Sequence, residues 1–217
     1  MRALSQEAVV LLNRIATVAA AKESVSVRDD QYVFIETQGT QQIKDQGSDT
    51  FRRSDWYAVD GRRPGLARIT VLSGPSAKGT EDMVMSAYPN ATTYRELAAL
   101  PTDPDRLYEK IWADTEGQGP THEAAALEMI GSMLEEATLL PEVDAALYRA
   151  AAKIPGVTVV EKARDLAGRA GIGLMFGNGD ESDVWVFDKE TLDYLGSDDV
   201  ALLASGVVDK IGDRSGD

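Results

Sequence analysis

The sequence predicts an α+β fold in which one antiparallel sheet has helices packed on one face. Two features of the pattern predict it. Helical and strand patterns are segregated: one helix, a group of strands, a block of helices and a second group of strands. The connections between the last strands are shorter than the dozen or more residues that a parallel crossover needs. With 217 residues, 43% of them apolar, the chain can bury one sizeable core. We therefore expect a single domain over residues 1–211 and a disordered polar tail over 212–217.

The first element is a predicted helix over residues 4–22. Its apolar residues recur at spacings of three and four, so they share one face; they are Leu4, Ala8, Leu11, Leu12, Ile15 and Ala19. Ser5 is a suitable N-cap for this helix.

Strands are predicted within residues 31–88. Tyr32–Thr37 is rich in β-branched and aromatic residues, which favour strands. The polar stretch 38–50 indicates a loop or a frayed hairpin, and the mixed aromatic and charged residues of 51–59 are typical of a half-solvated strand. After the turn signal Asp60-Gly61, further strands are expected at 66–72 and 83–85.

The block from 93 to 155 is predicted to be helical because four helix starts can be recognised in it. Thr93 and Glu96 have the spacing of a capping box. Asp103-Pro104 places a cap before a proline at the first helical position, Thr121 is a third cap, and Pro141 opens a fourth helix.

Residues 157–208 predict a meander of short strands separated by turn signals. The expected strands are 157–160, 162–166, 172–176, 184–188, 192–195 and 200–208.

Composition excludes several classes of function. The chain has no cysteine and one histidine, so thiolate chemistry, iron–sulfur clusters and a multi-histidine metal site are excluded within one chain. Its 22 basic and 36 acidic side chains give a net charge of −14, which argues against nucleic-acid binding and against anionic membranes. No stretch is long and apolar enough for a membrane span. We expect no cofactor, no metal and no catalytic residue.

Three glycine-rich or acidic segments resemble ligand-binding motifs in part, but their residues fit turns better. The segment 74–80 has Thr80 where a phosphate-binding loop needs a lysine, so a surface loop is expected. The glycines between 168 and 177 do not follow the dinucleotide-binding spacing and fit turns and close backbone approach. The acidic run Asn178–Asp183 lacks the alternation and distal Glu of a calcium loop, which favours an acidic hairpin tip.

His122 falls in the first turn of a predicted helix, where a positive imidazolium is disfavoured. No nucleophile motif accompanies it, so we expect a surface histidine rather than a general base.

Large apolar side chains on the predicted strands are the better candidates for a ligand site. They alternate in position, so both faces of the sheet receive some of them. Those proposed to line an apolar groove are Phe34, Trp56, Met175 and Trp185. Ordinary core packing is the competing explanation.

Several motifs in order resemble an uncharacterised actinobacterial family whose genes often lie beside those of sigma factors. They are Leu97-Ala98-Ala99-Leu100-Pro101-Thr102-Asp103-Pro104-Asp105-Arg106-Leu107, Leu147-Tyr148-Arg149-Ala150, Ile154-Pro155-Gly156-Val157, Asp165-Leu166-Ala167-Gly168-Arg169, Val186-Phe187-Asp188 through Leu195-Gly196, and Gly206-Val207-Val208-Asp209-Lys210. The resemblance covers about residues 30–212 and is strongest after 94.

The resemblance implies an extracytoplasmic domain that a membrane span tethers, with a fold similar to LolA- and RseB-like domains. In those domains a curved antiparallel sheet forms a half-open barrel with helices on its concave side. This chain departs from the family pattern because it lacks the span, so we expect an excised ectodomain, with the tether outside this chain. The resemblance carries over no catalytic residue.

The sequence leaves three functions open. The first is a non-enzymatic sensor or regulatory domain that binds a lipid, another apolar small molecule, or a protein partner of envelope signalling. The second is a carboxylate-based hydrolase, with or without a divalent cation, which requires at least two buried carboxylates in one cleft. The third is a structural spacer in the cell envelope.

Overall fold

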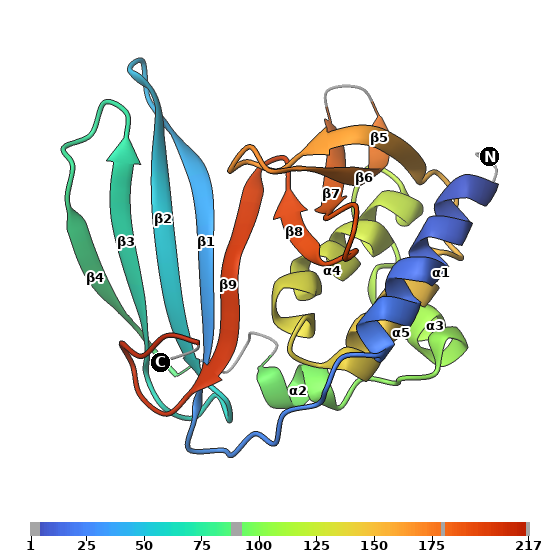
Figure 1. Cartoon of the computed structure of the whole chain (residues 1–217), viewed down its shortest axis with the longest axis horizontal. Coiled ribbons are helices and arrows are strands. Elements are labelled where there is room, and N and C mark those ends of the chain that lie inside the picture. The colour runs from blue at the N-terminus through green and yellow to red at the C-terminus, as the bar shows by residue number, and fades with distance from the viewer. Residues whose placement is uncertain (1–4, 88–92, 179–180, 216–217) are drawn as a thin grey trace.

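The chain forms one open antiparallel sheet with helices on one side of it (Figure 1). The computed structural model describes residues 5–87, 93–178 and 181–215. Within these residues the sheet has nine strands in the order β4-β3-β2-β1-β9-β8-β7-β6-β5. The predicted fold class, α+β with one antiparallel sheet, is confirmed.

The five helices of the described residues are α1 (Gln6–Ala20), α2 (Tyr94–Ala98), α3 (Pro104–Asp114), α4 (His122–Ala137) and α5 (Pro141–Ala151). The strands are β1 (Tyr32–Ile43), β2 (Gly47–Ala58), β3 (Gly65–Ser73), β4 (Thr80–Met85), β5 (Thr158–Arg164), β6 (Ala170–Asn178), β7 (Glu181–Phe187), β8 (Tyr194–Ser197) and β9 (Val200–Val208).

Local capping chemistry starts the helices where the sequence predicts. Thr93 and Glu96 close a reciprocal capping box on α2. Asp103 accepts the amide of Arg106 at the start of α3. Thr121 caps α4, and α5 begins at Pro141 without a side-chain cap. Each start is encoded within a few residues, which is why sequence alone finds it.

Three predicted boundaries are wrong. The stretch 38–50 is an ordered hairpin, because β1 and β2 stay paired from Tyr32↔Ala58 out to Ile43↔Gly47. The strands expected at 157–160 and 162–166 are one strand, β5. Its pairing with β6 shifts register between Val160 and Ala163, which accommodates the polar residues between them. The strand expected at 192–195 is displaced to Tyr194–Ser197.

The predicted disordered tail is also wrong for residues 212–215, and 216–217 lie outside the described residues. The chain turns after β9 and folds back over the sheet, where the main-chain carbonyl of Asp213 accepts a hydrogen bond from Trp56 Nε1 at 2.8 Å. A buried indole N–H needs an acceptor, and a polar tail can supply one as well as water can.

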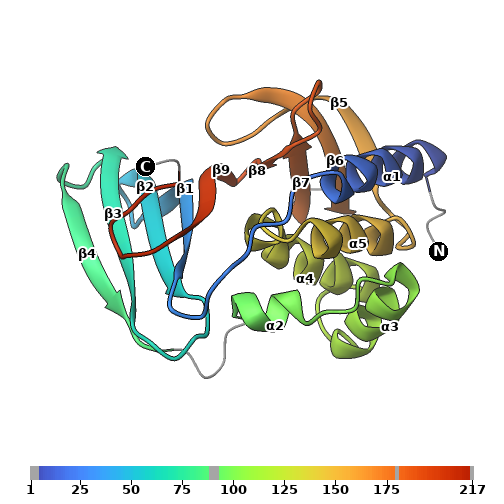
Figure 2. The same cartoon turned by 60° about the horizontal axis from the view of Figure 1, so that its bottom comes forward.

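The sheet has two parts that differ in how the helices cover them. The helices lie inside the angle between the β5–β9 part and the β1–β4 part (Figure 2). The main core joins α1, α3, α4 and α5 to β6 and β7. A smaller cluster places Val33 and Ile35 of β1 against Tyr94 of α2. We call β1–β4 the wing, and its helix-facing side the inner face.

No helix within the described ranges has both the length and the apolarity needed to cross a membrane.

Candidate functional site

The four residues proposed for an apolar groove do not meet in one place. Phe34 and Trp56 pack together on the outer face of the wing, with ring centroids 5.4 Å apart, and both are buried. Trp185 lies in the main core, where it contacts Phe176 edge to face. Met175 is exposed on β6. These side chains therefore line three separate environments, and core packing accounts for Trp185.

Gly131 makes room for Trp185 under α4. A Cβ at this position would lie 3.0 Å from Trp185 Nε1, so a helix with glycine here can approach the indole closely. The one sequence signal for this packing is Gly131 itself, a glycine inside the helix that the cap at Thr121 predicts.

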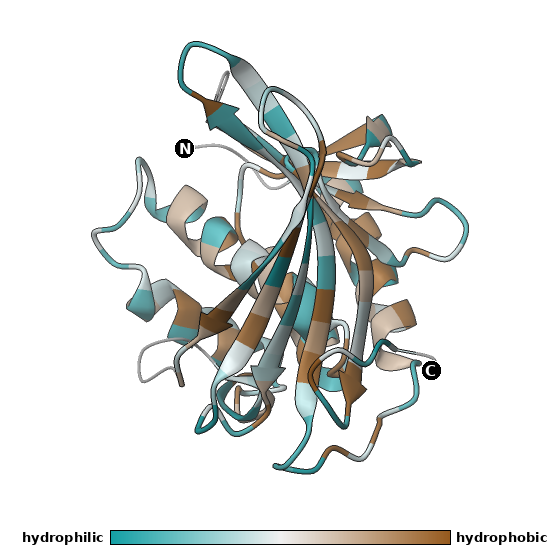
Figure 3. Cartoon of the chain, turned by 90° about the vertical axis from the view of Figure 1, so that its left-hand side faces the viewer, coloured by the Kyte–Doolittle hydropathy of each residue, from teal (hydrophilic) through white to brown (hydrophobic). Residues whose placement is uncertain are grey.

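The inner face of the wing carries both apolar and charged side chains. Antiparallel pairing places side chains from β2, β3 and β4 side by side, because directly paired residues share a face. We call the following set the inner wing surface: Arg53, Asp55, Tyr57, Ile69, Met83 and Met85. Hydrophobic and hydrophilic residues alternate along these strands (Figure 3).

An ion pair lies at the centre of the inner wing surface. Arg53 Nε is 2.7 Å from Asp55 Oδ2, and Asp55 has only 8% of its side chain exposed while Arg53 has 33%. Arg53 Nη2 also approaches the sulfur of Met85 at 4.0 Å. Burial raises the pKa of Asp55, and Arg53 opposes that shift.

The last turn of α4 faces this ion pair with two more carboxylates. Burial, with the nearby charges of Glu135 and Asp55, raises the pKa of Glu136 to about 7. Burial and Asp55 raise the pKa of Glu135 as well, against the opposing charge of Arg53. Burial and Asp55 also raise the pKa of Tyr57. Among the described residues, Asp55, Glu135 and Glu136 are thus carboxylates that act on one another at this place, with the guanidinium of Arg53 beside Asp55.

These carboxylates are not recognisable as a cluster from the sequence. Asp55 is on the second strand of the chain and Glu136 is at the end of the fourth helix, and the fold alone brings them together. The one available signal was the alternation Arg-x-Asp-x-Tyr in β2, which puts three polar side chains on one face.

The other sequence candidates are structural. Asp49 holds the loop after β3 by accepting the amide of Ser76 at 3.0 Å. Gly171 and Gly173 allow close packing, since a Cβ at either would lie under 3 Å from a neighbour. Asp180 of the acidic run lies outside the described residues.

His122 contacts the ring of Trp112, with centroids 3.7 Å apart, and its Nε2 is 2.7 Å from the Trp112 carbonyl oxygen. The ring joins α4 to α3, so the histidine is half-buried rather than on the surface.

A second carboxylate lies in the helical core. Asp144 of α5 is 2% exposed, and in the described part of the chain neither its Oδ1 nor the hydroxyl of Tyr148 makes a hydrogen bond of good geometry. The two side chains are nevertheless close enough for the Tyr148 hydroxyl to lower the pKa of Asp144 in part. Burial raises the pKa of Asp144 to about 7, against the opposing charge of Lys22. Lys22 is itself paired with Asp193 at 2.8 Å.

Within the described ranges no three His, Cys, Asp or Glu side chains are arranged to hold a metal ion. Comparison of the sequence with protein-family models and with curated proteins gives no match.

Proposed function

We propose that the chain is a non-enzymatic binding domain that takes an apolar ligand, such as a lipid, on the inner wing surface. The observation that carries this proposal is the distribution of the helices. Their packing is concentrated on β1 and on the β5–β9 part of the sheet. The inner face of β3 and β4 thus keeps apolar side chains in partial contact with solvent.

The chemistry of these side chains supports a ligand with an apolar body. Met83 is 48% exposed, and Ile69 and Met85 are half-buried. Exposed apolar residues that cluster mark interaction sites, and methionine adapts its shape to varied ligands. The carboxylates of the site disfavour an anionic head group next to Asp55 and Glu136, so a neutral or cationic ligand fits best.

The wider setting rests on the family resemblance. In line with that resemblance, we propose a tethered extracytoplasmic domain of a sigma-factor pathway, with a LolA- or RseB-like sheet. An open antiparallel sheet with helices on one side supports that proposal.

Two neighbouring positions of the edge strand β4 provide a matched test. Met83 lies on the inner face, opposite Ala67, whereas Val84 lies on the outer face, opposite Leu66. We expect Met83→Asp to weaken binding of the uncharged probe Nile red by about tenfold, because a carboxylate would then face an apolar ligand. Val84→Asp should leave the affinity within about twofold.

Both positions are exposed, so neither change should alter the free energy of unfolding by more than about 0.5 kcal/mol. Fluorescence titration measures the affinity, and thermal unfolding checks stability. Equal losses in the two variants would contradict the inner face as the site, as would the absence of probe binding to the parent chain.

A carboxylate-based hydrolase is the second candidate, and the pKa of Glu136 near 7 favours it, since a general base works best near the ambient pH. The ion pair to Arg53 counts against Asp55 as its partner. Hydrolysis of an ester or glycoside that Glu136→Gln abolishes without weakening Nile red binding would establish this candidate.

A further inference from the structure

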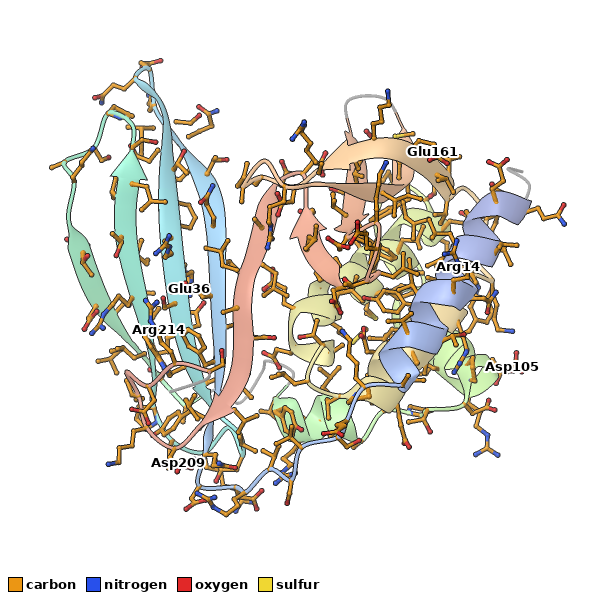
Figure 4. All side chains as sticks on the ribbon, in the orientation of Figure 1. Arg14, Glu36, Asp105, Glu161, Asp209 and Arg214 are labelled. Carbon is orange, nitrogen blue, oxygen red and sulfur yellow. The ribbon has the colours of Figure 1, made fainter. Side chains whose placement is uncertain are left out.

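Residues 209–215 cover part of the outer face formed by β1, β2 and β9. We call these residues the return segment. They leave β9 at Val208, turn at Gly212, whose φ is +99°, and cross back over β1 and β2. Figure 4 shows Arg214 of this segment beside Glu36 of β1.

Three features of the sheet meet three features of the return segment. Trp56 Nε1 donates to the main-chain carbonyl of Asp213 at 2.8 Å. Glu36 Oε2 is 3.1 Å from Arg214 Nη2 and also accepts the hydroxyl of Ser54 at 2.8 Å. The third contact is between Gly206 of β9 and Ser215.

Gly206 creates the space into which Ser215 fits. A Cβ on Gly206 would lie 2.4 Å from the Cβ of Ser215, so any larger residue on β9 would displace the segment. The sheet thus recognises a main-chain carbonyl, then a guanidinium, then a small side chain. This is how proteins bind extended peptides: main-chain contacts with pockets for chosen side chains.

With the return segment in place, its partners on the sheet are buried while most of its own residues stay exposed. On the sheet, Phe34 and Trp56 are at most 2% exposed and Glu36 is 6% exposed. In the return segment every residue except the half-buried Asp213 is exposed. Arg214 keeps 55% of its side chain exposed even while paired. The segment therefore lies on the surface, where Arg28 and Gln31 hold Asp209 at its start and the sheet holds its end at Trp56, Glu36 and Gly206.

We propose that the outer face of β1, β2 and β9 is a peptide-binding site, occupied by the return segment and open to a partner protein's segment with the same order of carbonyl, arginine and small residue. The return segment then acts as an internal competitor. A short tether gives it a local concentration of about millimolar, so a free peptide should bind the parent chain poorly.

The test uses the full chain with Arg214→Glu, which sets two carboxylates against each other and releases the segment. The control is Arg62→Glu, the same charge change at an exposed side chain outside this site. The probe is a labelled, end-blocked peptide of residues 210–215, with the sequence Lys-Ile-Gly-Asp-Arg-Ser. Fluorescence anisotropy measures its binding.

We expect the peptide to bind Arg214→Glu at least about tenfold more tightly than it binds the parent chain or the Arg62→Glu control. Replacing arginine by glutamine in the peptide should remove this binding. Acrylamide quenching of Trp56, identified by comparison with Trp56→Phe, should increase in Arg214→Glu and fall again when the peptide is added.

Three results would overturn the proposal, the third of them by changing the occupant. One is a folded Arg214→Glu chain with a quenchable Trp56 that does not bind the peptide. Another is a Trp56 that stays protected in both Arg214→Glu and the milder Arg214→Ala, which would make the segment a fixed part of the fold. Concentration-dependent dimers of Arg214→Glu in place of peptide binding would likewise contradict a partner's peptide as the occupant.

Discussion

Arg169→Ala should destabilise the fold by about 3 kcal/mol, near the lower end of what breaking a buried ion pair costs. Arg169 Nε is 2.6 Å from Asp165 Oδ2, and Arg169 Nη2 donates to the carbonyls of Leu195 and Leu202, each at 2.7 Å. The Asp165 side chain has no exposed area, whereas Arg169 has 38% of its side chain exposed. Without the Arg169 side chain, the buried carboxylate keeps the main-chain amide of residue 169 on Oδ1 but loses the guanidinium on Oδ2, and two carbonyls lose a donor.

Thermal unfolding measures this effect, and a loss of about 3 kcal/mol corresponds to a fall in Tm of about 6–12 °C for a chain of this size. Arg164→Ala is the matched control, because Arg164 is exposed and donates only to the carbonyl of Gly168. It should change stability by less than about 1 kcal/mol. The double variant with Asp165→Asn should be less destabilised than the sum of its parts, and strict additivity would contradict the argument.

Asp144→Asn should stabilise the protein at pH 8 by a few kcal/mol and have little effect near pH 4. The carboxyl is buried in the helical core, with a pKa of about 7 against an ordinary value of 3.8. Between those values the folded state binds more protons than the unfolded state, so the free energy of unfolding falls as pH rises. At about 1.4 kcal/mol per pKa unit, the upper limit is about 4 kcal/mol.

Urea unfolding at a series of pH values between 4 and 8 measures this contribution. Glu142→Gln is the control on the same helix, since Glu142 is exposed. The raised pKa values of Asp55, Glu135 and Glu136 give the parent chain a pH dependence of the same sign. Asp144→Asn should therefore flatten the profile without abolishing its slope, and an unchanged profile would show that Asp144 is solvated.

The sequence predicted best what neighbouring residues encode. The caps Thr93, Asp103 and Thr121 start helices through contacts within three residues, so no tertiary information is needed. For the outer half of the β1–β2 hairpin the sequence left a loop and a frayed hairpin open, because its polar residues carry no hydrophobic alternation. Its pairing continues from the buried base of the strands.

The candidate site could not be predicted because its parts are distant in sequence. Nothing near Asp55 in the chain indicates that the end of α4 faces it. The motif Asp165–Arg169, one of those on which the family resemblance rests, holds a turn to β8 and β9. Trp56 and Asp213 are also far apart in sequence, so the hydrogen bond that orders the polar tail could not be predicted either.

Native mass spectrometry of the gently purified chain, followed by organic extraction, tests the central claim most directly. If the inner wing surface binds an apolar ligand, the parent chain and Val84→Asp should carry an adduct of defined mass, or take one up from a lipid mixture. Met83→Asp should lose it. A parent chain that stays free of adduct after challenge with the lipid mixture, or an adduct that Met83→Asp retains in full, would contradict the proposed site.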